Sequence, residues 1–116
     1  MTNKQEFMKT LEQKISPIFI DTHYSIKINM TDGDGYKMID IFKNGESKRC
    51  AFIETSVKNN NYSISVQKIY VPRLNMEMNM PKPGEIKAGR YPNWVRYRDV
   101  SYDTVVDFCN NIVKCF

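Results

Sequence analysis

The stretch YKMIDIFKNGESKRCAFIETSVKNNNYSISV, residues 36–66, decides the fold class of this chain. Apolar and polar residues alternate in three runs within it, which is the period of a half-buried strand. Asn44-Gly45 separates the first run from the second, and residues 59–61 separate the second from the third. Asn-Gly is a strong hairpin signal, because both residues tolerate the positive φ of a tight turn. The stretch therefore predicts an antiparallel meander.

The two turns also predict a register. A two-residue loop at Asn44-Gly45 pairs Met38 with Ala51, and a similar loop in the next turn pairs Ile53 with Val66. A shift of one residue would move every side chain to the other face, so the register defines the core side of the sheet. We expect this core face to carry Tyr24, Ile26, Ile28, Met30, Tyr36, Met38, Phe42, Ala51, Ile53, Val57, Tyr62, Ile64 and Val66.

Helix signals flank the strands at both ends of the chain. Thr2 and Gln5 form a capping box, and Ser16-Pro17 ends the first helix. Ser101 is an N-cap for a C-terminal helix with one apolar stripe, Tyr102, Val105, Val106, Cys109, Ile112, Val113 and Phe116. We therefore predict one α+β domain, residues 1–116, with a single antiparallel sheet of about five strands. It is a meander of four strands plus a C-terminal strand, with both terminal helices packed on one face.

The second face of the sheet is the candidate binding surface. If Val95 and Tyr97 point into the core, Trp94, Arg96 and Arg98 point to the other side. An apolar patch rimmed by cations fits either a protein or single-stranded nucleic acid. The predicted binding residues are Trp94, Arg96, Arg98, Phe52, Ile39, Ile41, Lys37, Lys48 and Arg90.

Residues 70–93 have no periodicity and contain Pro72, Pro81, Pro83 and Pro92. We read this segment as one long irregular loop, which is more often functional than filler. Either it lies across the second face and makes Trp94 a core residue, or it leaves that face to a partner.

Catalytic and metal motifs do not withstand inspection. Asp40, Glu54 and Lys58 hint at a metal-dependent nuclease, but Lys58 is out of phase for a strand and Asp40 is expected to face Arg49. Lys48 and Arg49 would lower the pKa of Cys50, although a structural role is its default. His23 is the single histidine, and no triad can be placed around it. We predict no catalytic residue, no metal site and no cofactor.

Composition narrows the partner class. The chain has 116 residues, a net charge of +4 and three cysteines, with no signal-like or membrane-spanning apolar run. An odd number of cysteines argues against a disulfide framework, so we expect a cytoplasmic protein. Richness in Lys, Asn and Ile suits an AT-rich bacterial or phage genome. Acidic residues such as Glu85, Asp99 and Asp103 dilute the cations.

That dilution favours a protein partner over a nucleic acid. We therefore expect a small non-catalytic binding protein that acts on a macromolecule, such as an inhibitor, an adaptor or an anti-defence protein. A single-stranded nucleic-acid-binding module is the first alternative, and a nuclease-like enzyme is the second. No membrane contact is expected, and the sequence does not decide the oligomeric state.

Overall fold

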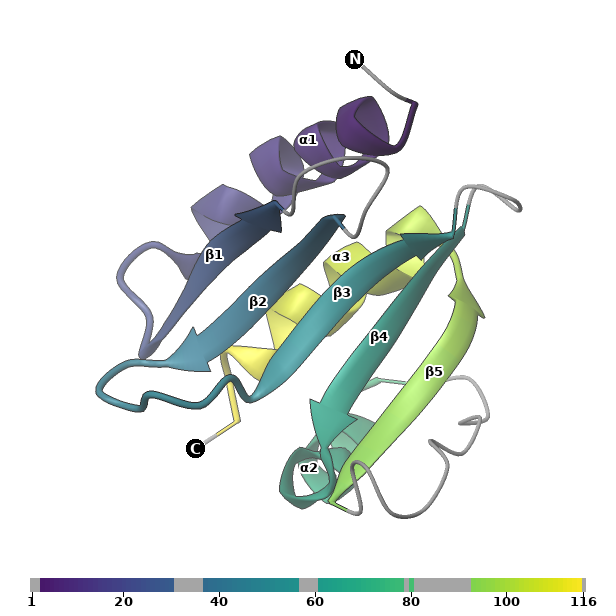
Figure 1. Cartoon of the computed structure of the whole chain (residues 1–116). Helices are drawn as coiled ribbons and strands as arrows, with labels where there is room; N and C mark the ends of the chain where they lie inside the picture. The colour runs from purple at the N-terminus through teal and green to yellow at the C-terminus, as the bar shows by residue number, and fades with distance from the viewer. Residues whose placement is uncertain (1–2, 31–36, 57–60, 79, 81–92, 116) are drawn as a thin grey trace.

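A computed structural model describes residues 3–30, 37–56, 61–78, 80 and 93–115 of the chain. Its centre is a 5-stranded antiparallel sheet, in which the strands lie side by side in their sequence order (Figure 1). The strands are β1 (Tyr24–Met30), β2 (Lys37–Lys43), β3 (Ala51–Ser56), β4 (Asn61–Gln67) and β5 (Trp94–Val100). The predicted α+β fold, with a meander of four strands and a C-terminal fifth strand, is confirmed.

Both terminal helices cover the same side of the sheet, which we call the core face (Figure 1). α1 (Asn3–Ile15) contacts β2 and β3, α3 (Tyr102–Ile112) contacts β4, and the two helices contact each other. The opposite side, which none of the described helices covers, is called the second face. None of the described helices has the length and hydropathy of a membrane span.

The ends of the terminal helices agree with the sequence where they are described. α1 ends at Ile15 and is followed by the 3-10 turn η1 (Ser16–Phe19), since a residue before proline disfavours the α conformation. Ser101 caps α3 by accepting a hydrogen bond from the Thr104 amide at 3.2 Å. Thr2, the predicted cap of α1, lies outside the described residues, as do the turn residues 32–35 and 59–60.

The stripe on α3 is wider than predicted. Val105, Cys109 and Ile112 are fully buried, as expected. Phe108 is buried to the same degree, although the predicted stripe left it out. It lies three residues after Val105 and four before Ile112, so it shares their side of the helix. Phe116 lies outside the described residues.

The predicted register between β2 and β3 is wrong. Met38 lies opposite Glu54 and Ile39 opposite Ile53, whereas a two-residue loop would have paired Met38 with Ala51. Gly45 takes a positive φ of 89° in a turn closed by the hydrogen bond from the Glu46 amide to the Lys43 oxygen, but Asn44 does not take the positive φ that the predicted two-residue hairpin turn requires. Moreover, β2 ends at Lys43 and β3 begins at Ala51, so the strands do not pair up to the turn. The intervening residues let the strands shift by an odd number of positions, which exchanges the two faces.

This exchange moves four side chains of β2. Ile39 and Ile41 are fully buried on the core face, not on the second face where the sequence had placed them. Met38 and Phe42 were expected in the core but alternate with these isoleucines, so they belong to the second face. The physical reason is that Ile39 and Ile41 pair with Ile28 and Ile26 of β1, on the same side as the helices.

The pairing of β3 with β4 differs from prediction by an even number of residues. Ile53 lies opposite Ile64, not opposite Val66. An even shift leaves each side chain on its own face. The predicted core residues Ala51, Ile53, Tyr62, Ile64 and Val66 are accordingly all buried.

Part of the segment 70–93 is helical, contrary to prediction. The 3-10 turn η2 (Lys68–Tyr70) leads into α2 (Val71–Glu77), which contacts α3 on the core side. Tyr70, Leu74 and Met78, spaced by four residues, are buried there. Pro72 stands in the first turn of α2, where a missing N–H costs nothing, so it starts this helix. Residues 81–92, for which the sequence left two positions open, either across the second face or away from it, lie outside the described residues.

Candidate functional site

The second face is organised in rows that run across the strands. The register places Asp40 beside Phe52, Phe52 beside Ser65, and Ser65 beside Arg96. In the next row, Trp94 lies opposite Gln67. The structure therefore brings together Phe52, Trp94 and Arg96, which the sequence had grouped from strand parity.

A stack of aromatic and guanidinium groups forms the centre of this face. The rings of Phe52 and Trp94 have centroids 5.3 Å apart and planes inclined by 48°. The guanidinium carbon of Arg49 lies 3.9 Å from the centroid of Phe52 and 5.9 Å from that of Trp94. Such cation–π contacts stabilise a partly desolvated arginine by about 0.5–2 kcal/mol. Phe52 is only 7% exposed as a result.

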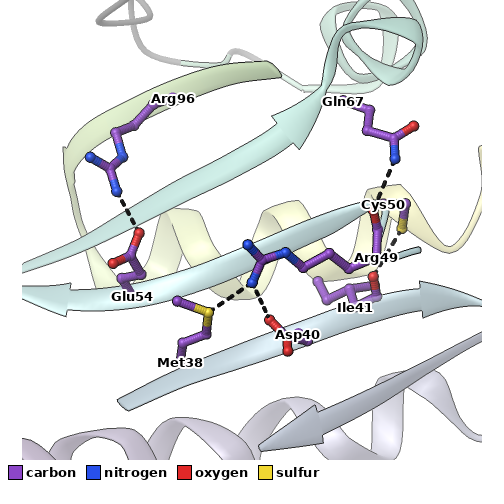
Figure 2. A network of polar contacts seen from close by, with 8 residues as sticks. All are labelled: Met38, Asp40, Ile41, Arg49, Cys50, Glu54, Gln67 and Arg96. Atoms are coloured by element: carbon purple, nitrogen blue, oxygen red, sulfur yellow. Dashed lines mark hydrogen bonds and ion pairs between the residues drawn. The ribbon is translucent and has the colours of Figure 1, made fainter. Parts of the chain in front are cut away.

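Two ion pairs lie on the same face as the stack, and Figure 2 shows both of them. Arg49 Nη1 donates to Asp40 Oδ1 at 3.0 Å and also contacts the Met38 sulfur at 2.9 Å. On the other side, Arg96 Nη2 donates to Glu54 Oε1. The residues Asp40 and Glu54 are only 6% and 9% exposed. One arginine neutralises each of these buried carboxylates, which offsets the cost of burying its charge.

Arg49 lies at the centre of the candidate site, although the sequence did not predict it there. Its pairing with Asp40 was expected, but as a cross-strand neighbour and not as the cover of an aromatic ring. The structure places Phe52 directly opposite Asp40, and the long Arg49 side chain reaches both. The sequence offered one indication of this position, which was the expected ion pair between Asp40 and Arg49 beside the predicted patch.

A pocket opens beside the stack. Its volume is ≈ 400 Å³. The lining residues are Asp40, Phe42, Ser47, Lys48, Arg49, Gln67 and Trp94. Gln67 Nε2 donates to the backbone oxygen of Arg49 at 2.9 Å, which fixes the chain at the pocket wall (Figure 2). Lys48 is exposed at this site, so the pocket combines an indole wall with two cations.

Two neighbouring polar atoms on this face have no hydrogen-bond partner among the described residues. They are Ser65 Oγ and Arg96 Nε, and both are buried. Buried polar groups are nearly always paired in folded proteins. Residues 65 and 96 are direct cross-strand neighbours, so the unsatisfied atoms mark one spot of the second face.

The remaining predicted binding residues are placed as follows. Arg98 and Lys48 are exposed, and Trp94 is half-buried. Ile39 and Ile41 belong to the core, as shown above. Lys37 is the first residue of β2, but its side chain and the whole of Arg90 lie outside what the structure describes.

The thiols do not form a reactive site. Lys48 and Arg49 were expected to lower the pKa of Cys50, but burial raises it to about 11. The Cys50 side chain points inward and its Sγ contacts the Ile41 carbonyl oxygen at 3.4 Å (Figure 2). Burial also raises the pKa of Cys109. Both thiols are protonated at neutral pH and act as small packing groups.

The carboxylates of the nuclease hypothesis are each paired with an arginine. Asp40 holds Arg49 and Glu54 holds Arg96, while Lys58 lies outside the described residues. In the described part of the chain, no three His, Cys, Asp or Glu side chains are grouped closely enough to hold a metal ion.

Compared with protein-family models, with curated proteins and with solved structures, the chain shows no significant match. The chemistry of the second face therefore carries the functional conclusion.

Proposed function

We propose that this chain is a non-catalytic binding protein whose second face docks on another protein. One observation carries the proposal. The stack of Phe52, Trp94 and Arg49 borders a pocket on the sheet face that none of the described helices covers. Tryptophan and arginine are the residues that most often anchor protein interfaces, particularly beside a pocket. The roles of inhibitor, adaptor and anti-defence protein all fit such a surface.

The same contacts weigh against a nucleic-acid partner. Single-stranded nucleic acid is held by bases that stack on free aromatic rings, together with cations on the phosphates. One side of Phe52 is already occupied by the Arg49 guanidinium, and its ring packs on Trp94. A protein partner does not need a free ring face.

The compartment belongs to the same proposal. Cys50, Cys109 and Cys115 are buried, and no disulfide joins any two of them. Cysteines that form no disulfide are typical of a reducing compartment, so we propose that the protein and its partner are cytoplasmic.

Site-specific photocrosslinking tests the proposal. A photoreactive amino acid replaces Ser47, an exposed residue of the pocket wall, and a matched one replaces Asn110, which is exposed on α3. In cells of the source organism we expect a protein adduct from position 47 and none from position 110. Trp94→Ala should abolish the adduct, whereas Met76→Ala, at a residue 80% exposed on α2, should leave it unchanged.

Two results contradict the proposal. Equal adducts from positions 47 and 110 would mean that the second face is not the docking surface. The other is a change in the emission of Trp94, the only tryptophan in the chain, on addition of a single-stranded oligonucleotide. A change that disappears as salt rises would indicate a nucleic-acid partner. Circular dichroism of each variant confirms that it is folded.

A further inference from the structure

We infer that the protein segment that docks on the second face is acidic, and that one of its carboxylates enters the pocket between Lys48 and Arg49. The inference rests on the proposed function and specifies the chemistry of its partner. Three features of the second face carry it: the arrangement of its charges, the geometry of Arg49, and the apolar walls of the pocket.

The charges of the second face are layered by depth. Its carboxylates, Asp40 and Glu54, are almost fully buried and are neutralised within the face by Arg49 and Arg96. Its lysines are at the surface: Lys27 lies opposite Asp40 and is exposed, and Lys48 is exposed at the pocket. Among the described residues, neither lysine has a carboxylate within ion-pair distance.

Arg98 adds a further exposed cation on β5. Among the described side chains of this face, the exposed charges that we identify are therefore positive, although the layer beneath them is balanced. Complementary charge steers association and selects partners, so a negatively charged segment fits this face.

Arg49 is held in place to receive a carboxylate. Both of its side-chain hydrogen bonds to described residues, to Asp40 and to Met38, use Nη1. Its plane rests on the Phe52 ring, and its backbone oxygen is held by Gln67. In Figure 2 the second terminal nitrogen of the guanidinium points away from Asp40. An arginine that is already ordered loses little entropy when it binds an anion.

The pocket walls favour a carboxylate on a protein over a phosphate on a nucleic acid. Trp94 and Phe42 line the pocket beside Lys48 and Arg49. Its ≈ 400 Å³ is at the low end of ligand pockets, about 300–1,000 Å³, so it suits side chains of an acidic segment with an apolar neighbour. A nucleic-acid chain would instead need the ring faces that the stack already uses.

The probe is a tryptophan-free peptide of glutamate and leucine, with a glutamine and leucine peptide of equal length as its control. Binding is followed by the emission of Trp94, the only tryptophan. We expect the glutamate peptide to change this emission and the glutamine peptide to leave it unchanged. Lys48→Glu should weaken binding by about tenfold or more, since it places like charges together. Lys9→Glu, the same charge change at an exposed position of α1, should have less than a twofold effect.

The inference is overturned if the glutamate peptide leaves the emission unchanged up to millimolar concentration. It is also overturned if the glutamine peptide binds equally well, or if Lys9→Glu weakens binding as much as Lys48→Glu. None of these results contradicts the proposed function if Trp94→Ala still abolishes the adduct at position 47. If the adduct forms equally well in Trp94→Ala, both the inference and the proposed function are contradicted. Binding of an oligonucleotide in place of the peptide, with a steep salt dependence, also removes both.

Discussion

Both faces of the sheet have buried residues at their centres, but different groups cover them. On the core face, α1 and α3 cover the strands, and residues such as Ile39, Ile64 and Phe108 are fully buried. On the second face, the strands are covered by their own side chains. Arg49 lies over Phe52, Trp94 packs against it, and the buried carboxylates lie beneath the arginines.

The two kinds of cover differ in how much they contribute to the stability of the fold. Interlocking aliphatic side chains give a face that loses several kcal/mol when one is truncated, so it serves folding. The second face is covered by long polar and aromatic side chains, and the polar groups that it buries cost desolvation free energy. This is the surface that the proposed function assigns to recognition.

The largest expected effect compares one phenylalanine from each face. Phe108→Ala, on the core face, should lower the free energy of unfolding by about 3–5 kcal/mol, because it leaves a cavity that helices and strands cannot close. Phe52→Ala should cost about 1.5–3 kcal/mol, the value of a buried side chain without the cavity term, since Arg49 and Trp94 can settle into the space. Guanidinium unfolding followed by far-UV circular dichroism measures both. Equal losses would break the distinction between the two faces.

The tyrosines of the core face predict an alkaline limit to stability. Burial raises the pKa of Tyr24 and of Tyr62 from 10.0 to about 12. The folded chain therefore keeps these phenol protons after the unfolded chain has released them. Their contribution is complete below pH 10 and is lost as the pH rises to about 12. The loss is about 1.4 kcal/mol per pH unit for each tyrosine, or about 3 kcal/mol over two units.

Absorbance at 295 nm and the denaturation midpoint, measured against pH, test this limit. The stabilising contribution of the Cys50 thiol, whose pKa burial raises from 9.0 to about 11, begins to be lost at pH 9. Tyr24→Phe is the matched control. It removes one of the phenols with a raised pKa, together with the hydrogen bond that Tyr24 Oη donates to the Cys115 carbonyl at 2.9 Å. If every tyrosine titrates near pH 10 while the midpoint stays constant, these rings are not buried as described.

An intermediate effect is expected at the ion pair of the second face. Asp40→Asn leaves Arg49 without its charge partner and should cost about 1–3 kcal/mol, as for a hydrogen bond to a charged group. It should also shift the emission of Trp94, because Arg49 covers the stack only while Asp40 holds it. Lys48→Ala, at an exposed residue, is the control and should stay within about 0.5 kcal/mol of the parent. If the emission of Trp94 is unchanged in Asp40→Asn, the stack of Phe52, Trp94 and Arg49 does not depend on the ion pair.

The smallest effect concerns the helix that seals the core face. Ser101→Ala removes the acceptor of the Thr104 amide and should cost about 1 kcal/mol. Ser101→Asp keeps an acceptor and places a negative charge at the start of α3, so it should restore the stability. Thermal unfolding measures both variants. A neutral Ser101→Ala would mean that tertiary packing alone holds this helix end.

The sequence predicted most of the elements because their signals are local. Ser101 capped its helix, Pro17 ended the first one, and alternation identified the strands, since each of these effects acts within a few residues. It also grouped Trp94, Phe52 and Arg96 correctly, because strand parity depends only on counting along a strand. Pro72 also carried a local signal for the start of α2, although together with the other prolines of residues 70–93 it indicated an irregular loop.

What the sequence determined is therefore the order of helices and strands and the antiparallel meander. The tertiary structure alone decided which face each side of β2 joins. Asn44-Gly45 fixed a turn, but the residues between it and β3 left the register free. Helix packing against Ile39 and Ile41 then selected it. The same β2–β3 register places Asp40 opposite Phe52, and it brings Arg49 over the Phe52 ring. The candidate site therefore depends on a register that burial across the sheet selected against the local preference of the turn.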